Sequence, residues 1–479
     1  MLRILGSTTR LCDGLTRREA LRAGGLGLLG LTLADLDAGA APGAASLRRF
    51  GQAKSCILLY LYGAPSQLET FDLKPEAPDD VRSQFRPIAT SVPGVQICEH
   101  LPRTARVMHR ATLIRSLTSP YNIHNVAYAL SGVPTTDIPM ELNPRDTRHW
   151  PCFGSVLDYL ATRGGQHLRD LPTQVALPWK FSSRSEPFRR GGPFGGFLGT
   201  GYDPVWAEFH GQATKGDPFV GIAPKMRFQV SQPGAAEITL DRLDQRRSLL
   251  QQFDRARARL LDSEVARGFD RQQQMALRLV SSSKMGRALD VEREPHSLRE
   301  RYGFTLFGQS VLAARRLIEA GVRLTTVFWD EFREANSAWD THVRQETRLR
   351  DELCPGFDLA YSALLDDLEV RGLLDETLVV VLSEHGRTPK LNKTPGGGRE
   401  HWGGAFSALL AGGGVRRGQV LGATDRIAAF PKDYPVSPKD VLATIYHLLG
   451  VDPATHLHDR EGRPVGLVPG GKVIEPVLA

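Results

Sequence analysis

The feature that most constrains the fold is the apolar, β-branched run Thr377–Leu382, which leads directly into Ser383-Glu384-His385-Gly386-Arg387. An apolar run of this length, followed by Gly386 and Pro389, predicts a buried strand that ends at Glu384. In open α/β sheets, ligands bind at the carboxyl ends of the strands. A carboxylate and an imidazole at that position are groups that a metal-dependent hydrolase needs. We therefore expect a functional site where this strand ends.

Other segments repeat the alternation of strand and helix. The predicted strands are 55–62, 112–117, 174–178, 322–328, 377–382 and 406–410, and the predicted helices include 122–132, 357–368 and 441–449. This order predicts an α/β fold with a central, mostly parallel sheet flanked by helices. The length of 479 residues allows a large core, and we expect it to form one domain over 46–479.

A helical insertion is expected around residues 240–320. Apolar residues keep a helical period there, with charged and amide residues between them: Leu249, Leu250, Phe253, Leu260 and Leu261. Such a pattern predicts amphipathic helices packed against the main sheet. We interpret the charges of this segment as a solvated face.

The first 45 residues have the order of an export signal. Arg17-Arg18 precedes the apolar stretch Ala23–Leu33, and small residues follow, with Ala38-Gly39-Ala40 as a cleavage-like site. This order predicts a twin-arginine signal peptide over 1–45, and the alternative is a chance Arg pair before a short apolar helix. The apolar stretch is too short and Gly-rich for a stable membrane span. We expect the twin-arginine translocation machinery to export the folded protein to the periplasm or beyond.

Charge and cysteine usage narrow the functional classes. The net charge of +7 is spread along the chain without a basic block, so nucleic-acid binding is not expected. None of the five cysteines has CxxC spacing, which excludes a zinc finger or a redox motif. After export, one or two disulfides and buried free thiols both remain open.

Three groups of residues predict a cation site at the carboxyl edge of the sheet. Asp340 and His342 follow the strand at 322–328 and, two residues apart in an extended segment, point the same way. Glu384 and His385 share a site because their strand ends there, and His401 follows in a Gly-rich loop. Carboxylate and imidazole without thiolate suit Zn²⁺, Mn²⁺ or Fe, whereas Mg²⁺ and Ca²⁺ are less suited to the His-rich part; of these we expect Zn²⁺ or Mn²⁺. Taken singly, each group also fits a structural hydrogen bond or ion pair.

Two further segments carry polar residues at the same edge. Glu69 and Asp72 follow the first strand and are additional metal-ligand candidates, with a simple turn as the alternative. Ser119 before Pro120 has the pattern of a helix N-cap, the interpretation we favour over a nucleophile. Asn122 and His124 then lie at the predicted helix start, and for His124 structural and functional roles are equally open.

Four motifs together resemble a known bacterial family. They are Gly63-Ala64-Pro65-Ser66-Gln67-Leu68-Glu69-Thr70-Phe71-Asp72, Trp339-Asp340-Thr341-His342, Ser383-Glu384-His385-Gly386-Arg387-Thr388-Pro389 and Gly398-Arg399-Glu400-His401-Trp402. The chain is similar to a twin-arginine-exported family of uncharacterised function that is abundant in planctomycetes. That family is placed in the superfamily of alkaline phosphatases and sulfatases. The resemblance implies an alkaline-phosphatase-like core over nearly the whole mature chain.

The resemblance also implies a two-cation site. Asp340, His342 and His401 look like the ligands of one cation, and Glu384 with His385 like the Asp-His pair of the other. The superfamily has an Asp directly after the first strand, where this chain has Tyr62-Gly63. It also has a Ser, Thr or modified Cys nucleophile, where this chain reads Tyr121-Asn122-Ile123-His124. Metal-activated water is therefore the expected nucleophile.

These observations leave two functional hypotheses. The first is a hydrolase of phosphate or sulfate esters, acting on a small molecule or a polysaccharide, with one or two divalent cations and with His124 and Asn122 at the reacting group. In this hypothesis Arg387 or Arg399 holds the substrate anion by a bidentate contact, or else pairs with Glu384 or Glu400. The second is an exported, non-catalytic binding or assembly protein with a degenerate site.

Overall fold

A computed structural model describes residues 49–134, 143, 144, 146, 148–163, 171–185, 190–230 and 283–479. Arg49–Ala479 forms one compact unit. Its centre is a sheet of nine described strands in the order β13-β4-β12-β9-β1-β8-β5-β6-β7. The predicted signal peptide and residues 240–282 lie outside the described residues.

The strands of the central sheet are β1 (Ser55–Leu61), β4 (Ala111–Leu117), β5 (Gln174–Leu177), β6 (Val205–His210), β7 (Arg227–Val230), β8 (Leu324–Trp329), β9 (Thr377–Leu382), β12 (Phe406–Ala411) and β13 (Gln419–Leu421). The short strands are β2 (Pro87–Ala89), β3 (Gln96–Cys98), β10 (Gly386–Arg387), β11 (His401–Trp402), β14 (Ala423–Thr424), β15 (Pro431–Asp433), β16 (His456–His458) and β17 (Pro464–Gly466). The described α-helices are α3 (Pro102–Val107), α4 (Val126–Ser131), α5 (Phe153–Arg163), α8 (Ser283–Leu289), α9 (His296–Tyr302), α10 (Leu306–Ala320), α11 (Gln345–Arg348), α12 (Cys354–Val370) and α13 (Pro438–Leu448).

Most pairings in the central sheet are parallel. Strand β1 pairs in parallel with β8 and β9, and the pairs β5–β8, β5–β6 and β4–β13 are parallel too. Strand β12 runs antiparallel to β4 and β9, and β7 runs antiparallel to β6. The predicted mostly parallel sheet is confirmed.

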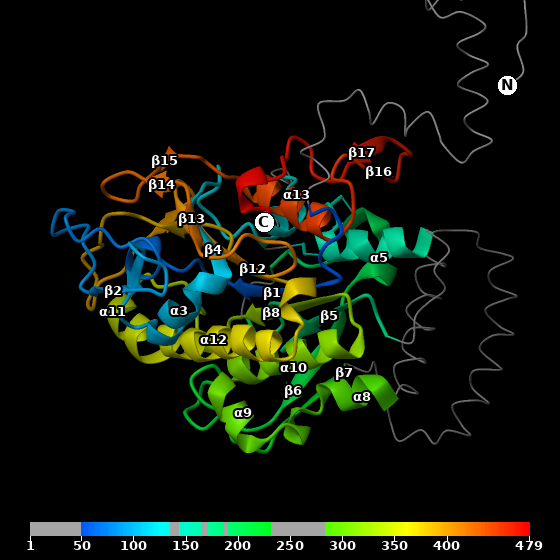
Figure 1. Ribbon diagram of the computed structural model, residues 1–479, viewed down its shortest axis with the longest axis horizontal. Coiled ribbons are helices and arrows are strands. Elements are labelled where there is room, and N and C mark those ends of the chain that lie inside the picture. Colours follow the sequence, from blue (N-terminus) through cyan, green and yellow to red (C-terminus); the bar gives the residue numbers. More distant parts are fainter. Residues whose placement is uncertain are drawn as a thin grey trace, which may run out of the picture. The chain divides into compact units, whose positions relative to one another are not determined.

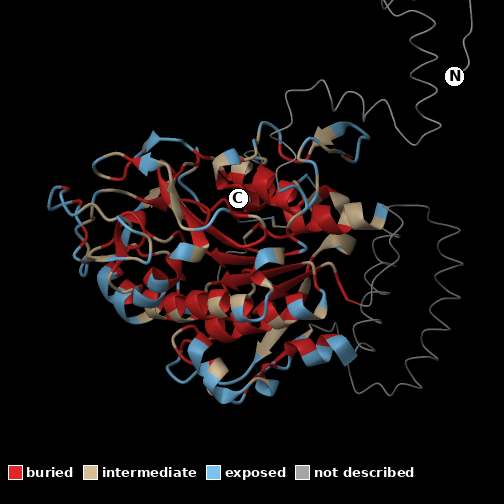
Figure 2. Ribbon diagram, in the orientation of Figure 1, coloured by how far each residue is buried: buried red, intermediate tan, exposed pale blue. Residues whose placement is uncertain are grey.

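Helices cover both faces of the sheet, as Figure 1 shows for α10 and α12 on one side and α5 and α13 on the other. Every residue of β1, β8 and β9 is buried, and the buried residues gather along the sheet and the inner helix faces in Figure 2. Continuous apolar runs are the expected sequence of parallel strands covered on both faces. The predicted helical layers are therefore confirmed together with the sheet.

The described part of the predicted insertion is helical and packs on the sheet, as expected, but one of its charges is buried. Residues 283–320 form α8, α9 and α10, and α10 packs on the sheet beside β8 and β1. The solvated face predicted for the charges is wrong for Arg315, which is fully buried. Its guanidinium contacts Glu294 at 2.8 Å and Asp367 at 2.9 Å. These carboxylates provide the pairing that a buried charge requires.

The helix predicted from Asn122 begins later. Its N-cap is Asn125, whose side chain accepts a hydrogen bond from the Tyr128 N–H at 2.9 Å. The Ser119 cap is therefore wrong, because the Ser119 hydroxyl instead accepts from the Tyr121 N–H at 3.3 Å. The segment before the helix is left as a loop at the carboxyl edge of the sheet.

Two further observations concern the state of the cysteine thiols and the search for membrane-spanning helices. Cys56, Cys98, Cys152 and Cys354 are buried free thiols, which resolves the open choice for these four residues. Among the described helices, none combines the length and apolarity needed to cross a membrane.

Candidate metal centre

The central strands deliver polar residues to one point because their ends are in register. Leu61 at the end of β1 lies beside Trp329 at the end of β8, and Tyr60 lies beside Leu382 at the end of β9. The loop after β8 carries Asp340 and His342, and Glu384 follows β9 directly. The structure thus brings the predicted groups together at the carboxyl edge.

Gly63 explains how the loops approach so closely. It has φ +95°, and a Cβ at this position would lie 2.4 Å from the Asp340 nitrogen. Its N–H donates to Glu384 Oε1 at 2.8 Å. A side chain here would force the Asp340 loop away from the sheet. The resemblance implies an Asp side chain directly after β1. In this chain that position contributes a backbone N–H, which Gly63 donates to Glu384.

Asp340, His342 and His401 form the first group of converging ligand atoms. Asp340 Oδ1 lies 3.0 Å from His342 Nε2 and 3.2 Å from His401 Nε2. The two Nε2 atoms lie 3.0 Å apart. These atoms come from the loop after β8 and from β11, and they all fall within 4.8 Å of one another. The first cation site implied by the resemblance has this composition.

The outer nitrogens of three rings lie beside hydrogen-bond acceptors. His342 Nδ1 lies 2.6 Å from Glu400 Oε2, and His385 Nδ1 lies 2.8 Å from the Gly386 carbonyl oxygen. His401 Nδ1 lies 3.3 Å from the carbonyl oxygen of Asn122. A neutral ring that donates from Nδ1 keeps its lone pair on Nε2. A ring in this tautomer can bind a cation through Nε2, but while His342 and His401 donate from Nε2 to Asp340 that atom carries a proton.

His124, His385 and His401 form a second group whose ligand atoms lie within 4.8 Å of one another. His124 Nδ1 is 2.8 Å from Glu384 Oε1, and His124 Nε2 is 3.4 Å from Asp340 Oδ2. His124, which the sequence places at the reacting group, therefore stands between two carboxylates. Glu384 lies beside this group, on the opposite side of the His124 ring from Asp340.

Burial and hydrogen bonding shift the pKa values of His385, His124 and Asp340 in different directions. Burial lowers the pKa of His385 to about 3. Burial would also lower the pKa of His124, but hydrogen bonds to Asp340 and Glu384 raise it to about 9. Burial would raise the pKa of Asp340, but hydrogen bonds from three imidazoles hold it far below its usual range. His385 is therefore a neutral imidazole near pH 7, and Asp340 is a carboxylate.

Glu69 and Asp72 are not brought to the cluster. The carboxylate of Glu69 pairs with the Arg399 guanidinium at 2.6 Å, and Asp72 pairs with Lys74 at 2.9 Å. Both side chains are nearly fully buried. Their placement as metal ligands is therefore wrong in this structure, because other cations of the chain already neutralise them.

Arg387 and Arg399 are fully buried, and every guanidinium nitrogen has an acceptor. The nitrogens of Arg387 donate to Asp340 Oδ1, to His342 Nε2 and to the carbonyl oxygens of Gly63, Ala64, Trp339 and Arg399. Those of Arg399 donate to the Glu69 carboxylate and to the carbonyl oxygens of Val81, Thr388 and Pro389. These donors are thus engaged within the protein, and the bidentate contact to a substrate anion stays a prediction. The predicted pairing with Glu384 or Glu400 is wrong.

Asn122 lies behind His401. Its side-chain oxygen accepts from the Gly403 N–H at 2.6 Å, and its carbonyl oxygen faces His401 Nδ1. A Cβ on Gly403 would lie 2.3 Å from the Ser119 carbonyl oxygen, so glycine is needed for this close approach. In this structure Asn122 orients His401, and the expected contact with the reacting group is replaced by this positioning role.

Two residues of the site are missed by sequence reasoning. Glu400 holds His342, and its signal is its place directly before His401. Tyr62 packs its ring 4.9 Å from the ring of His124 and is fully buried. Nothing in the sequence marks Tyr62 as a packing partner of His124, because an aromatic residue at the end of a buried strand is ordinary core.

Comparison with known proteins gives distant structural likenesses and one family. No curated protein matches. A sulfatase from Pseudoalteromonas sp. shares 10% identity at a TM-score of 0.37, covering 84% of this chain and 69% of that one. The lipoteichoic acid synthase LtaP from Listeria monocytogenes shares 10% sequence identity at a TM-score of 0.39. The match covers 90% of this chain and 78% of that one. A phosphonate monoester hydrolase from Silicibacter pomeroyi shares 13% sequence identity at a TM-score of 0.35. The match covers 89% of this chain and 76% of that one.

The family comparison covers nearly the whole described unit. Residues 53–478 match the family described as "Protein of unknown function (DUF1501)". The match includes every residue of the histidine cluster and excludes the predicted signal peptide. The chain therefore belongs to the DUF1501 family.

Proposed function

We propose that the protein is an exported hydrolase of phosphate or sulfate esters that uses one or two divalent cations, Zn²⁺ or Mn²⁺. The observation that carries this proposal is the convergence of possible ligand atoms in two groups that share His401: Asp340, His342 and His401 in one, and His124, His385 and His401 in the other. The Nδ1 atoms of His342, His385 and His401 each lie beside an acceptor. Hydrogen-bonded outer nitrogens are the usual environment of metal-binding histidines.

The donor set fits a cation of this type. Asp340, His342 and His401 would hold one ion, and His385 with Glu384 would contribute to a second. His385 Nε2 is buried and has no hydrogen-bond partner among the described residues, and a buried polar atom without a partner is costly. When bound, a cation would supply Lewis-acid polarisation of the ester oxygen and a lower pKa of water.

The remaining side chains define what the protein itself contributes. His124 is directed between the two carboxylates, where it can orient the ester or give a proton to the leaving group. The region Tyr121–His124 holds no hydroxyl or thiol nucleophile apart from the Tyr121 phenol, and the Ser119 hydroxyl is engaged with the Tyr121 N–H. Water is therefore the proposed attacking group. Arg387 fixes the Asp340 loop against the sheet.

A second function, binding without catalysis, is favoured by one observation. The Arg387 guanidinium contacts both Asp340 Oδ1 and His342 Nε2. A permanent cation at these atoms could replace a metal ion in a degenerate site. Metal content separates the two functions, because only the hydrolase requires an ion.

The decisive experiment measures bound metal and ester hydrolysis on the same purified protein. We expect stoichiometric Zn²⁺ or Mn²⁺ and turnover of aryl phosphates or aryl sulfates. His124→Ala should lower turnover while the bound metal stays unchanged. Metal-free protein that stays inert after cations are added would support the binding function. A covalent phosphoryl or sulfuryl adduct on Ser119 would overturn the water mechanism.

Export is proposed from the N-terminal sequence. The double substitution Arg17→Lys and Arg18→Lys should leave the protein in the cytoplasm, because the twin-arginine machinery reads the Arg pair. Fractionation of cells that express the wild type and this variant measures the effect. Equal export of the two proteins would contradict the proposal.

A further inference from the structure

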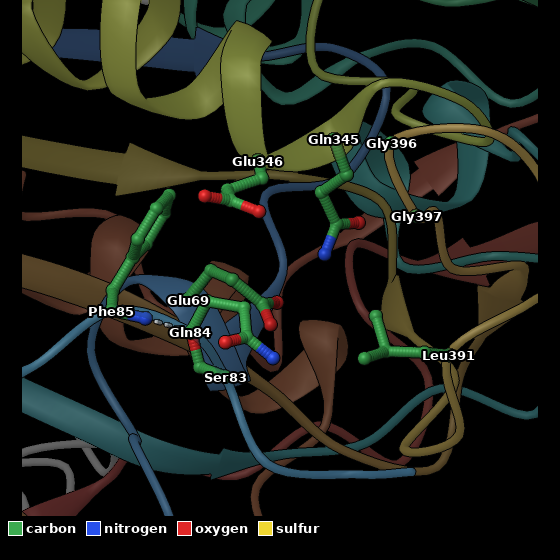
Figure 3. Close-up of a pocket in the computed structure, with 9 residues that line it drawn as sticks. All are labelled: Glu69, Ser83, Gln84, Phe85, Gln345, Glu346, Leu391, Gly396 and Gly397. Atoms are coloured by element: carbon green, nitrogen blue, oxygen red, sulfur yellow. Dashed lines mark hydrogen bonds between the residues drawn. The ribbon is translucent and has the colours of Figure 1, made fainter. Parts of the chain in front are cut away.

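A cavity of about 260 Å³ is lined in part by Gly396 and Gly397, which belong to the segment that precedes His401 (Figure 3). Three segments and one acidic side chain build its walls. The lining residues are Glu69, Ser83, Gln84, Phe85, Gln345, Glu346, Leu391, Gly396 and Gly397. Nothing in the proposed hydrolysis uses this cavity.

One buried side chain points into the cavity with an unused donor. Gln345 is 2% exposed, and its Oε1 accepts a hydrogen bond from the Thr341 hydroxyl at 3.0 Å. Its Nε2 has no hydrogen-bond partner among the described residues. Figure 3 shows this nitrogen directed into the space between Glu346 and Gln84. A buried amide without its hydrogen bonds is destabilising unless a ligand or water completes them.

The other walls offer acceptors and an apolar surface. Glu69 and Glu346 contribute carboxylates, and Gln84 contributes an amide that can both donate and accept. Phe85 and Leu391 are the apolar residues of the lining. The lining holds no Lys, Arg or His. An anionic ligand would therefore meet carboxylates in the lining, because the cations that pair with them, Arg399 at Glu69 and Arg350 at Glu346, are not lining residues.

We propose that this cavity binds a neutral polyhydroxylated ring, such as one sugar residue of a glycan. Sugar hydroxyls both donate and accept, so they can satisfy the Gln345 amide and the Glu346 carboxylate together. The C–H face of such a ring can pack on Phe85. An ammonium group only donates, so it would leave the Gln345 nitrogen unpaired. A wholly apolar ligand would leave both polar groups unpaired.

Glycines keep this space open and tie it to the metal centre. Gly396 and Gly397 have φ values of +76° and +65°, where side chains are strained. The next residue, Gly398, packs so closely that a Cβ would lie 1.8 Å from the His342 carbonyl oxygen. The loop that walls the cavity therefore also lies on a proposed metal ligand. A sugar bound here would sit next to the centre, whether or not the centre hydrolyses esters.

Binding is tested on the full-length protein with a defined panel: D-glucose, D-galactose, N-acetyl-D-glucosamine and D-glucosamine. Saturation-transfer NMR and calorimetry at millimolar sugar give the affinities. We expect at least one neutral sugar to bind, and D-glucosamine to bind no tighter than its N-acetyl form. Gln345→Glu keeps an acceptor for Thr341 but removes the donor, and should weaken binding by about tenfold.

Further variants separate a binding defect from misfolding. Glu346→Ala, on an exposed wall, should also weaken binding, and Glu376→Gln, in a remote exposed pair with Lys54, should not. Failure of every neutral sugar to bind would overturn the proposal. So would unchanged affinity in both cavity variants, or binding of D-glucosamine alone. Binding is read without ester turnover, so it stands or fails separately from the proposed hydrolysis.

Discussion

Two carboxylates close to the carboxyl edge of the same sheet have opposite surroundings. Glu69 faces the permanent cation Arg399, and both side chains are almost completely buried. Asp340 instead faces imidazole nitrogens of two partly exposed histidines, His342 and His401, although one of its oxygens also contacts Arg387. The first arrangement is complete without a ligand. The second brings lone pairs together, which is favourable only when a proton or a cation joins them.

The different partners of Glu69 and Asp340 give a criterion for which acidic residues near a strand end are functional. A carboxylate is structural when a guanidinium and backbone carbonyls satisfy the whole group. It is a metal-ligand candidate when its neighbours are imidazoles held from outside. The variants below test this distinction from the largest expected effect to the smallest.

The largest effect is expected from breaking the Glu69 pair. Arg399→Met leaves a buried carboxylate without its cation and should reduce the free energy of unfolding by about 3–5 kcal/mol. Urea unfolding measures the change. The double variant Arg399→Met with Glu69→Gln should recover part of it, because the uncompensated charge is gone.

The matched control for this variant is an exposed pair. Lys54 and Glu376 have side-chain exposures of 71% and 47%. Exposed pairs contribute about 0–1 kcal/mol, so Lys54→Met should change stability little. An Arg399 variant as stable as the Lys54 variant would contradict the structural role of the buried pair.

A third kind of carboxylate is buried with no cation in contact. Asp330 follows β8, is 1% exposed, and accepts hydrogen bonds from Trp179 Nε1 and the Ser182 N–H. Burial raises its pKa to about 7. Because the folded state holds the proton more tightly than the unfolded chain, this contribution is full below about pH 4 and is lost as the pH rises to about 7.

The substitution Asp330→Asn should therefore flatten the fall of stability between about pH 4 and 7. The full shift of the Asp330 pKa to about 7 corresponds to a change of roughly 4 kcal/mol in the free energy of unfolding, which is an upper value. Urea unfolding of both proteins at several pH values gives the difference in slope. Parallel curves for the wild type and the variant would show that Asp330 does not titrate in this range.

Much of the sheet can be predicted because its strands are continuous apolar runs. The strand at Thr377–Leu382 is predicted at its observed bounds, and the approach of Asp340, His342, Glu384, His385 and His401 follows from strand ends that meet at one edge. Residues next to a predicted strand end are thus placed well by local pattern.

The remainder depends on which long-range partner each charged group finds. The sequence shows Glu69 and Arg399 only as residues 330 positions apart, so their pairing is invisible to local pattern. The same holds for Arg315, whose helix looks amphipathic but whose guanidinium pairs with Glu294 from the segment before α9 and with Asp367 from α12. The late start of α4 was decided by Asn125, since more than one residue of that loop could cap a helix.

The next effect is expected at the proposed metal centre. His401→Ala removes the imidazole shared by both ligand groups and should lower metal affinity by about 100-fold or more. Metal analysis after dialysis against a chelator series measures it. His109→Ala, which removes an exposed histidine outside the cluster, is the control. Equal metal content in the two variants would place the ion elsewhere or exclude it.

The smallest effect is expected outside the cluster, at Glu400. Its carboxylate lies 2.6 Å from His342 Nδ1, and its side chain is 57% exposed. Removing such an outer partner usually lowers metal affinity by 10–100-fold, and exposure places Glu400 at about tenfold, because water can replace it. Glu400→Ala should therefore bind metal about tenfold more weakly than the wild type, while stability measured without metal changes little.

The conservative variant Glu400→Gln isolates the cause. Its amide oxygen can still accept from His342 Nδ1, so it should recover most of the affinity lost in Glu400→Ala, even though the charge is absent. If both variants lose the same affinity, the charge of Glu400 matters and the tautomer does not. If neither loses affinity, the His342 ring is oriented by its own loop, and the contrast with the Glu69 pair rests on Asp340 and His401 alone.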